Sequence, residues 1–194
     1  MSHYFTEDEN LGHNVVLKKV VINEHEFTFF TDNGVFSKKG LDFGTRSLLE
    51  NLPLNIHGEV LDFGCGYGPI GIYLKKKYDC NVDMIDVNNR CVELAKKNAL
   101  NNNVLVNVFN SNIYENITKK YDYIITNPPI RVGKQILYQI LFDAKEHLAL
   151  GGQIWLVINK DQGAKSLLKD LGAEYNTKLI CKNKGFYIIC AQYN

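Results

Sequence analysis

The sequence predicts an α/β fold, a doubly wound and mostly parallel seven-stranded sheet preceded by a small N-terminal β-hairpin. Three observations lead to this fold. From residue 59 onward, short apolar runs alternate with segments whose apolar residues recur every three or four positions. A glycine-rich turn follows the first of these runs, in the place where such sheets bind ligands. The length of 194 residues suits one domain with a substantial core.

The N-terminal part of the chain differs from this alternation. Two apolar stretches, 15–22 and 27–30, are separated by the polar residues 23–26, and this pattern predicts a β-hairpin. We therefore expect residues 1–40 to form a hairpin extension. Residues 41–194 are then expected to form a single main domain.

The elements of the main domain follow from apolar spacing and from the positions of proline and glycine. A short helix is expected to start at Gly44, with Thr45 as its N-cap, and to end before Pro53. The later helices are predicted by spacings such as that of Cys91, Leu94 and Ala95. The expected strands are 59–63, 81–86, 103–109, 121–126 and 152–158, and the expected helices are 69–77, 89–100 and 133–149.

The C-terminal part of the chain departs from a parallel arrangement. A helix near 162–171 is followed by two apolar stretches at about 174–181 and 186–192. They are joined by the short polar segment 182–185, and so tight a link makes an antiparallel hairpin. The C-terminal strand is therefore expected to run opposite to the others.

Composition excludes several classes of protein. With 45% hydrophobic residues, 22% charged residues and a net charge of +1, the chain has no global basic field. Its five cysteines form no C-x-x-C pair and have no histidine at ligand spacing, so we expect no disulfide framework and no metal site. The polar, acidic N-terminus and the absence of a long apolar stretch predict a cytoplasmic protein without a membrane segment.

The glycine-rich turn at 64–71 predicts a cofactor site, because four glycines in eight residues let a ligand approach main-chain amides. The segment 66–71 fits G-x-G-x-x-G, and Asp86 lies twenty residues beyond Gly66. This pattern alone leaves a dinucleotide and S-adenosylmethionine both open. Asp62 favours the second, since a carboxylate there suits an ammonium or sulfonium and would repel a pyrophosphate.

A second motif, Asn127-Pro128-Pro129, directly follows the strand predicted at 121–126. Two prolines stiffen the backbone and remove two N–H donors, so mainly acceptors remain. The Asn127 side-chain oxygen and the Pro128 carbonyl can both accept hydrogen bonds from one –NH2 group. We therefore interpret Asn127 and Pro128 as catalytic residues that hold an amino nitrogen in line with an electrophile.

Together these motifs resemble the class I S-adenosylmethionine-dependent methyltransferases, in particular the small methyltransferase domain shared with ribosomal small-subunit methyltransferase C. The matching segments run in the family's order and span most of the chain. The resemblance implies a Rossmann-like methyltransferase fold and S-adenosylmethionine as cofactor. The matching segments are 36–45, 61–71, Asp86, 127–134 and 161–164.

The resemblance also implies roles for individual residues. The methionine end of the cofactor is expected at Asp62 and the turn at Gly64, Cys65 and Gly66, the ribose at Asp86 and the adenine near Asn112. Simpler interpretations stay open: Asp62 ties the loop through backbone amides, Asp86 is a turn residue and Asn112 a polar loop residue. Cys65 is then a small core residue rather than a nucleophile, and Asn127-Pro128-Pro129 only a rigid turn.

The acceptor side is expected to include Pro129, Ile130, Arg131 and Lys134. The two basic residues suit a phosphate backbone, although a plain basic surface pair is the alternative. Ile130 departs from the related enzymes that act on base amines, which often have an aromatic residue there to stack on an extruded base.

The sequence thus predicts a methyltransferase acting on an amino nitrogen, with guanine N2 of ribosomal RNA as the favoured acceptor and ribosomal RNA or a ribosomal particle as the partner. Adenine N6, a protein glutamine amide and a small-molecule amine are alternatives with the same chemistry. A nicotinamide-dependent oxidoreductase and a non-catalytic RNA-binding module are the alternatives from other classes.

Overall fold

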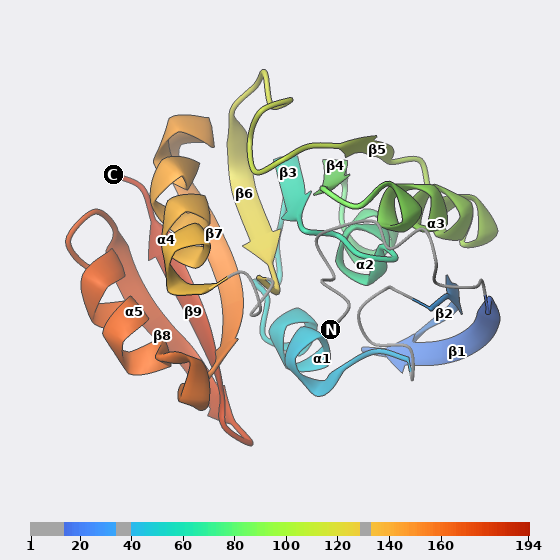
Figure 1. The fold of residues 1–194 in the computed structure, drawn as a ribbon, viewed down its shortest axis with the longest axis horizontal. Coiled ribbons are helices and arrows are strands. Elements are labelled where there is room, and N and C mark those ends of the chain that lie inside the picture. Colours follow the sequence, from blue (N-terminus) through green and yellow to red (C-terminus); the bar gives the residue numbers. More distant parts are fainter. Residues whose placement is uncertain (1–13, 34–39, 129–132) are drawn as a thin grey trace.

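The structure is a computed structural model, and it describes residues 14–33, 40–128 and 133–194. The described residues form a two-stranded sheet and a seven-stranded sheet with helices on both faces (Figure 1). In chain order, the elements are β1 (Val16–Ile22), β2 (His25–Thr31), α1 (Phe43–Glu50), β3 (Gly58–Phe63), α2 (Pro69–Lys77), β4 (Cys80–Asp86), α3 (Asn89–Asn101), β5 (Asn107–Asn110), β6 (Tyr121–Thr126), α4 (Gly133–Asp143), the 3-10 helix η2 (Ala144–His147), β7 (Leu148–Asn159), the 3-10 helix η3 (Lys160–Gln162), α5 (Ala164–Leu171), β8 (Asn176–Asn183) and β9 (Phe186–Gln192).

The large sheet has the strand order β5-β4-β3-β6-β7-β9-β8. The pairs from β5 to β7 are parallel, whereas β9 is antiparallel to both of its neighbours, β7 and β8. The strand order reverses direction between β3 and β6, and ligands bind at the carboxyl ends of strands at such a point. The predicted fold class, with its reversed C-terminal strand and its N-terminal hairpin, is confirmed.

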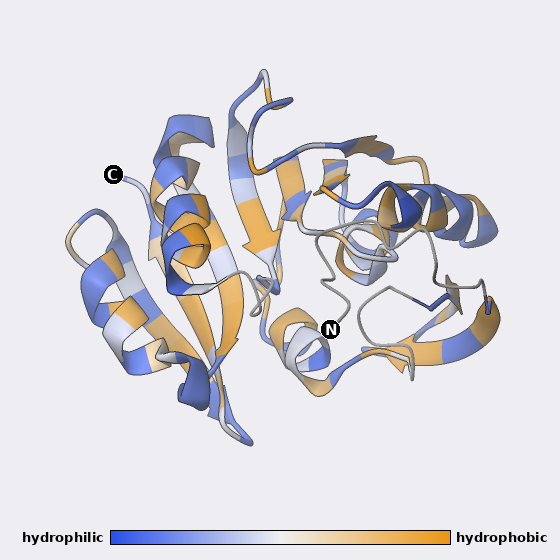
Figure 2. Cartoon of the chain, viewed as in Figure 1, coloured by the Kyte–Doolittle hydropathy of each residue, from blue (hydrophilic) through white to orange (hydrophobic). Residues whose placement is uncertain are grey.

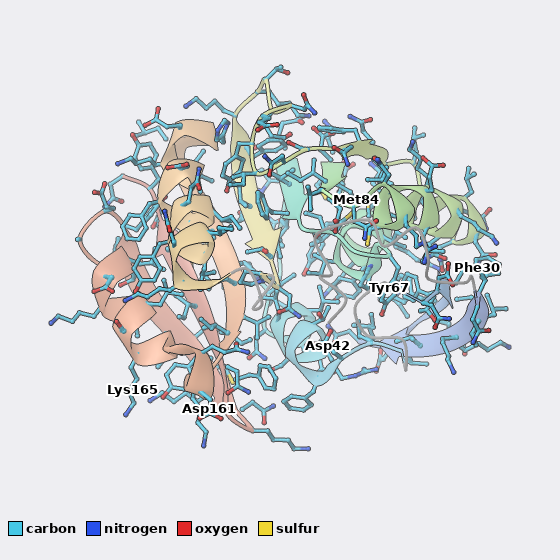
Figure 3. The ribbon with its side chains drawn as sticks, in the orientation of Figure 1. Phe30, Asp42, Tyr67, Met84, Asp161 and Lys165 are labelled. Atoms are coloured by element: carbon cyan, nitrogen blue, oxygen red, sulfur yellow. The ribbon has the colours of Figure 1, made fainter. Side chains whose placement is uncertain are left out.

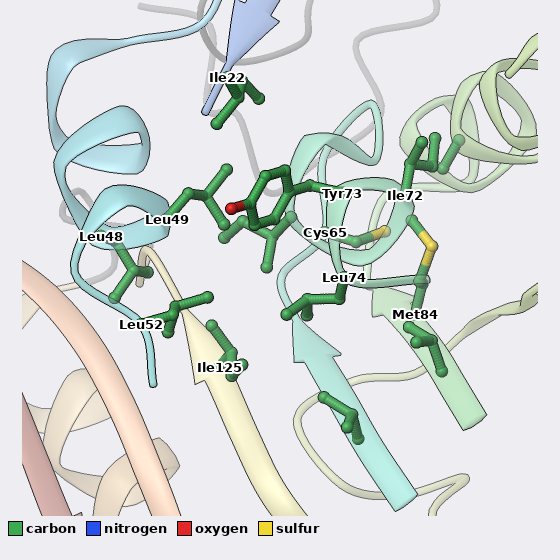
Figure 4. Close-up of a cluster of buried hydrophobic side chains, with 14 of the residues drawn as sticks. Ile22, Leu48, Leu49, Leu52, Cys65, Ile72, Tyr73, Leu74, Met84 and Ile125 are labelled. Carbon is green, nitrogen blue, oxygen red and sulfur yellow. The ribbon is translucent and has the colours of Figure 1, made fainter. Parts of the chain in front are cut away.

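Two hydrophobic cores lie on opposite faces of the sheet. Along β3, Val60 belongs to one core and Leu61 to the other, because successive side chains of a strand point to opposite faces. The first core collects side chains from the hairpin, α1, α2 and α3 (Figure 4), and the second collects those of α4 and α5. The hydropathy colouring of Figure 2 shows apolar strands between helices whose outer surfaces are polar.

Several side chains bond the hairpin to the helices of the main domain, and one of them, the buried Asn98 of α3, also reaches the glycine-rich turn. Its amide donates to the carbonyls of Phe30 (2.9 Å) and Tyr67 (2.8 Å), and its Oδ1 accepts from the Phe30 N–H (2.7 Å). Asn98 thereby connects β2 with the glycine-rich turn. The proposed boundary between 1–40 and 41–194 stays a prediction.

The start of α1 corrects one expectation. Thr45 is not the N-cap, because Asp42 has extended backbone angles and its Oδ1 accepts from the Thr45 N–H at 2.9 Å. A carboxylate at this position satisfies an N–H group that the helix itself cannot.

Several predicted boundaries also differ from those of the structure. The strand expected at 103–109 begins only at Asn107, since Asn103 has a φ of 55° and the Val104 N–H still bonds to the Ala99 carbonyl at the end of α3. The helix expected at 133–149 ends at Asp143. β7 begins at Leu148, earlier than the expected strand, and includes Gly151 with its φ of 79°.

No helix in the described ranges is long and apolar enough to cross a membrane.

Candidate active site

The glycine-rich turn connects β3 to α2 and has a backbone that glycine favours. Gly64, Gly66 and Gly68 have φ values of 69°, 56° and 96°, in the left-handed region that residues with a Cβ avoid. A Cβ on Gly66 would meet no atom within 4 Å. One side of the turn is therefore open to a ligand that approaches the main chain.

The far end of the turn is tightly packed instead. A Cβ on Gly71 would lie 2.6 Å from both Cγ and Sδ of Met84, and 3.1 Å from Oδ2 of Asp62. α2 therefore begins close against β4. Its free N–H groups, at the positive end of the helix dipole, face the carboxyl edge of the sheet.

Asp62 is completely buried at the end of β3. Its Oδ2 accepts from the Gly71 N–H at 2.8 Å. Asp62 thus ties the loop through a backbone amide, which was the simpler interpretation of this residue. Its Oδ1 has no hydrogen-bond partner among the described residues. Burial raises the pKa of Asp62 to about 7, although the hydrogen bond from Gly71 lowers it. The negative charge of the nearby Asp86 adds to the increase. A buried carboxylate oxygen without a donor fits a cationic ligand group such as an ammonium.

Asp86 lies at the end of β4 and faces the same turn. Its Oδ2 accepts from the Gly66 N–H (2.9 Å), and its Oδ1 accepts from the Asn88 N–H (2.9 Å). Burial raises the pKa of Asp86 despite these hydrogen bonds. Asn112 lies beyond β5 and is exposed, and its side-chain amide donates to Glu115 at 2.9 Å.

Cys65 is buried beside the two carboxylates. Burial first, and then the negative charges of Asp86 and Asp62, raise the pKa of its thiol well above the ordinary value. A thiolate is therefore scarce at neutral pH, which argues against nucleophilic chemistry at this residue.

Asn127 follows β6 at the same edge of the sheet, and its amide orientation is fixed from α1. Its Nδ2 donates to Thr45 Oγ1 at 2.9 Å and to Asp42 Oδ1 at 3.3 Å. Both amide hydrogens are thereby used, and no hydrogen bond between described residues involves the Asn127 Oδ1. Pro128 follows and is buried. Asn127 therefore presents an acceptor, as an amine-holding role requires.

The remaining acceptor-side residues are only partly described. Pro129, Ile130 and Arg131 lie outside the described residues. Lys134 is exposed in the first turn of α4, where its ammonium lies 4.8 Å from the centre of the Tyr138 ring.

Sequence reasoning missed two contributors to the site. Tyr67 is buried within the glycine-rich turn, and its hydroxyl has no partner among the described residues. Burial first, and then the negative charge of Asp42, raise the pKa of the Tyr67 hydroxyl; both residues are labelled in Figure 3. Asn98 supports the turn from behind, and its polar side chain on the apolar face of α3 was the available signal.

Comparison with known proteins agrees with this geometry. The sequence matches the family described as methyltransferase small domain over residues 26–190. The chain belongs to this family. The predicted resemblance is thus confirmed, and with it S-adenosylmethionine as the family's cofactor.

Individual relatives in this family differ in length. The Bacillus subtilis (strain 168) "Uncharacterized protein YbxB" is 39% identical, with 98% of each chain covered. Ribosomal RNA small subunit methyltransferase C of Colwellia psychrerythraea is 34% identical over 90% of this chain and 50% of its own. A T. thermophilus 16S rRNA N2 methyltransferase (RsmC), solved in complex with AdoMet and guanosine, superposes with a TM-score of 0.83 at 26% identity, over 93% of this chain and 51% of its own. The chain thus spans about half the length of these methyltransferase C relatives.

Proposed function

We propose that this protein transfers a methyl group from S-adenosylmethionine to an amino nitrogen, and that this nitrogen is guanine N2 of ribosomal RNA. The orientation of Asn127 carries the proposal. Because Thr45 and Asp42 take both of its amide hydrogens, its Oδ1 is left to accept a hydrogen bond from a substrate –NH2 group. The Pro128 carbonyl, which follows directly, is the second acceptor.

The cofactor residues fit the same proposal. S-adenosylmethionine supplies an electrophilic methyl carbon on a sulfonium centre. Asp62, with one unpaired buried oxygen, suits the ammonium group of its methionine end, and the open side of Gly66 leaves room beside the main chain. We assign Gly64 and Cys65 to the same turn, Asp86 to the ribose hydroxyls and Asn112 to the adenine edge.

Positioning is the main contribution expected of Asn127 and Pro128. The lone pair of a base amine is delocalised, so the nitrogen is a weak nucleophile until it is held in line with the methyl carbon. Orientation of this kind is worth on the order of 7–11 kcal/mol of barrier. Two acceptors on the N–H groups also direct the lone pair away from the base.

The relatives favour guanine over the other amines. Proteins named ribosomal RNA small subunit methyltransferase C share 34% identity or more with this chain, and the RsmC structure holds guanosine. Adenine N6, a glutamine amide and a small-molecule amine offer the same –NH2 chemistry and are distinguished by assay. A nicotinamide site no longer competes, because the chain belongs to a methyltransferase family.

The test is methyl transfer from labelled S-adenosylmethionine to small-subunit ribosomal particles, their extracted RNA, protein fractions and small-molecule fractions, with identification of the methylated product. We expect N2-methylguanine in the RNA. The variant Asn127→Ala should lower kcat by at least a hundredfold and leave cofactor affinity within threefold of the unaltered protein, since it removes one acceptor from the transition state. Label in another base, in protein or in a small molecule would contradict the guanine assignment. Equal losses of kcat and cofactor affinity would contradict the role of Asn127.

A further inference from the structure

The turn between β8 and β9 lies at the same edge of the sheet as the candidate active site. In the strand register, Phe186 pairs with both Asn183 of β8 and Asn159 of β7. β7 in turn runs parallel to β6, which ends at Thr126 just before Asn127. Figure 1 shows this turn and α1 along one edge of the molecule. The turn is therefore a neighbour of the residues that hold the amine acceptor.

Ring contacts connect the turn to the start of α1. The rings of Phe43 and Phe186 have centres 5.7 Å apart, and a Cβ on Gly44 would lie 3.0 Å from the Phe186 ring. The Lys184 ammonium lies 5.0 Å from the centre of the Phe43 ring. Phe43 directly follows Asp42, which bonds to Asn127. Lys184 thus contacts the residue next to Asp42, whose side chain accepts from the Asn127 amide.

The surface around this turn is basic. Residues 176–192 include Lys178, Lys182 and Lys184 and contain no Asp or Glu. Lys160, which follows β7, packs its methylene groups against the turn, with Cε 3.6 Å from the position of a Cβ on Gly185. We call the set Lys160, Lys182, Lys184 and Phe43 the β8–β9 rim, in which Lys182 lies over the Tyr187 ring on the other face of the hairpin from Phe43. It is a local concentration of charge in a chain whose net charge is only +1.

The rim lysines are available to an external anion. All three are exposed, and none forms an ion pair within the part of the chain that the structure describes. Other lysines of this protein do pair with acids: the pairs are Lys96 with Glu93, Lys119 with Glu59 and Asp83, and Lys145 with Glu174.

Two acids, Asp42 and Asp161, lie near the rim, and neither forms an ion pair with a rim lysine among the described residues. Asp42 is half-buried, and its Oδ1 already accepts from the Thr45 N–H and the Asn127 amide. Asp161, labelled in Figure 3, is exposed beside Lys160 in the sequence and makes no ion pair with a described residue. Three lysines against two acids leave an excess of one positive charge at the rim.

The backbone of the turn adds a second observation. Lys184 and Gly185 have φ values of 44° and 84°, as a two-residue hairpin turn with both central residues left-handed requires. Asn, Asp or Gly is preferred at the first of these positions, and another residue costs about 1–2 kcal/mol there. The chain nevertheless places a lysine at this position, with its ammonium above an aromatic ring beside the acceptor site.

Exposed cations interleaved with an aromatic ring suit a nucleic-acid strand, because phosphates take the charges and a base or ribose packs on the ring. We propose that the β8–β9 rim binds the phosphate backbone of the single-stranded RNA that flanks the methylated base. This inference rests on the proposed function, since the rim adjoins the acceptor site only if Asn127 receives the substrate amine.

The test compares two double variants that remove the same charge. Lys160→Gln with Lys184→Gln alters the rim, and Lys120→Gln with Lys169→Gln alters exposed lysines that lie before β6 and late in α5. Binding of a labelled, guanine-containing single-stranded RNA oligonucleotide is measured by fluorescence anisotropy at several salt concentrations. Methyl transfer to extracted small-subunit RNA is measured in parallel.

The rim variant is expected to bind the oligonucleotide about tenfold more weakly than the unaltered protein. The slope of the logarithm of its affinity against the logarithm of the salt concentration should become shallower by about 1.4. Two lysines are removed, and each contact to a single-strand phosphate contributes about 0.7 to this slope. KM for RNA should rise while kcat at saturating RNA and cofactor affinity stay unchanged, and the control variant should retain most of the slope.

Two results would overturn the rim assignment while the proposed function stands: an unchanged salt slope in the rim variant, or an equal loss in the control variant. A rim-dependent affinity for poly-glutamate with unchanged RNA binding would instead identify an acidic protein as the partner. If the unaltered protein methylates protein or a small molecule and no RNA, the proposed function fails first and the rim assignment fails with it.

Discussion

The buried carboxyl of Asp62 offers the sharpest test of the cofactor site, through the variant Asp62→Asn. In the folded protein the pKa of this carboxyl is raised from 3.8 to about 7 by burial. Between these values the unfolded chain loses the proton and the folded protein keeps it, so the free energy of unfolding falls as pH rises. Each pH unit corresponds to about 1.4 kcal/mol, and the full interval to about 4 kcal/mol.

The sign of this effect defines the experiment. Below pH 4 both the folded and the unfolded state hold the proton, and Asp62 contributes nothing to the pH dependence. Above pH 7 both states have lost the proton, and the loss of unfolding free energy caused by burying the carboxylate has reached its full value. Asparagine cannot ionise, so the variant lacks this term and gains stability relative to the unaltered protein as pH rises. Any fixed cost of the new amide group is the same at all pH values and cancels from the slope.

Urea unfolding of the cofactor-free protein and the variant, at intervals from pH 5 to pH 8, measures the difference directly. We expect the difference in unfolding free energy to grow by about 1.4 kcal/mol per pH unit up to about pH 7 and then to level. Other ionisable groups are common to both proteins. A difference that does not vary with pH would refute the buried, protonated carboxyl.

Cofactor binding should respond in the opposite direction. In the proposed cofactor site the carboxylate form of Asp62 pairs with the ammonium group, so the affinity of the unaltered protein for S-adenosylmethionine should rise as pH passes through about 7. Asp62→Asn should weaken binding by about 30-fold to several thousandfold, as expected for the loss of a buried charge partner worth about 2–5 kcal/mol. Titration calorimetry of both proteins measures this, and equal affinities would refute the cofactor role.

Two further predictions concern the geometry of the site. Thr45→Val removes one acceptor of the Asn127 amide while the Asp42 cap remains, so kcat should fall up to about tenfold at unchanged cofactor affinity. Thr45→Ser keeps the hydroxyl and should restore kcat. A parallel loss of cofactor affinity would contradict the role of Thr45 in orienting Asn127. Gly71→Ala places a Cβ 2.6 Å from Met84 and should lower the unfolding free energy by about 1–3 kcal/mol. Gly66→Ala places a Cβ with no atom within 4 Å and should lower the unfolding free energy by about 1–2 kcal/mol, through its left-handed backbone alone. Urea unfolding measures both variants, and a loss below about 1 kcal/mol for Gly71→Ala would contradict the close packing against Met84.

Regular periodicity predicted the fold well. The helix at 69–77 and the strand at 121–126 were predicted with the bounds that the structure has, because Pro69 and the Asn127-Pro128 pair mark their ends. The strand expected to begin at 103 was placed too early. Its first residues close α3 through main-chain hydrogen bonds, which apolar spacing does not encode.

The site was harder to predict from the sequence, since its contacts join distant segments. The Asn127 amide bonds to residues 42 and 45, more than eighty positions away, and the resemblance placed both only within the matching segment 36–45. Thr45 was interpreted as a helix cap because Thr caps helices often. Its hydroxyl instead orients Asn127, and only the fold brings the two together.

The three hydrogen bonds of Asn98 have a consequence for local unfolding. An isolated two-stranded hairpin is marginally stable in water, and within the described ranges β1 and β2 pair only with each other. Asn98 bonds both to the backbone of Phe30 and to the carbonyl of Tyr67 in the glycine-rich turn. Detachment of the hairpin therefore leaves that buried amide without two of its partners and loosens the turn behind the cofactor site. We therefore expect the hairpin and the turn to open as one cooperative unit, and a ligand that orders the turn to stabilise the hairpin against opening.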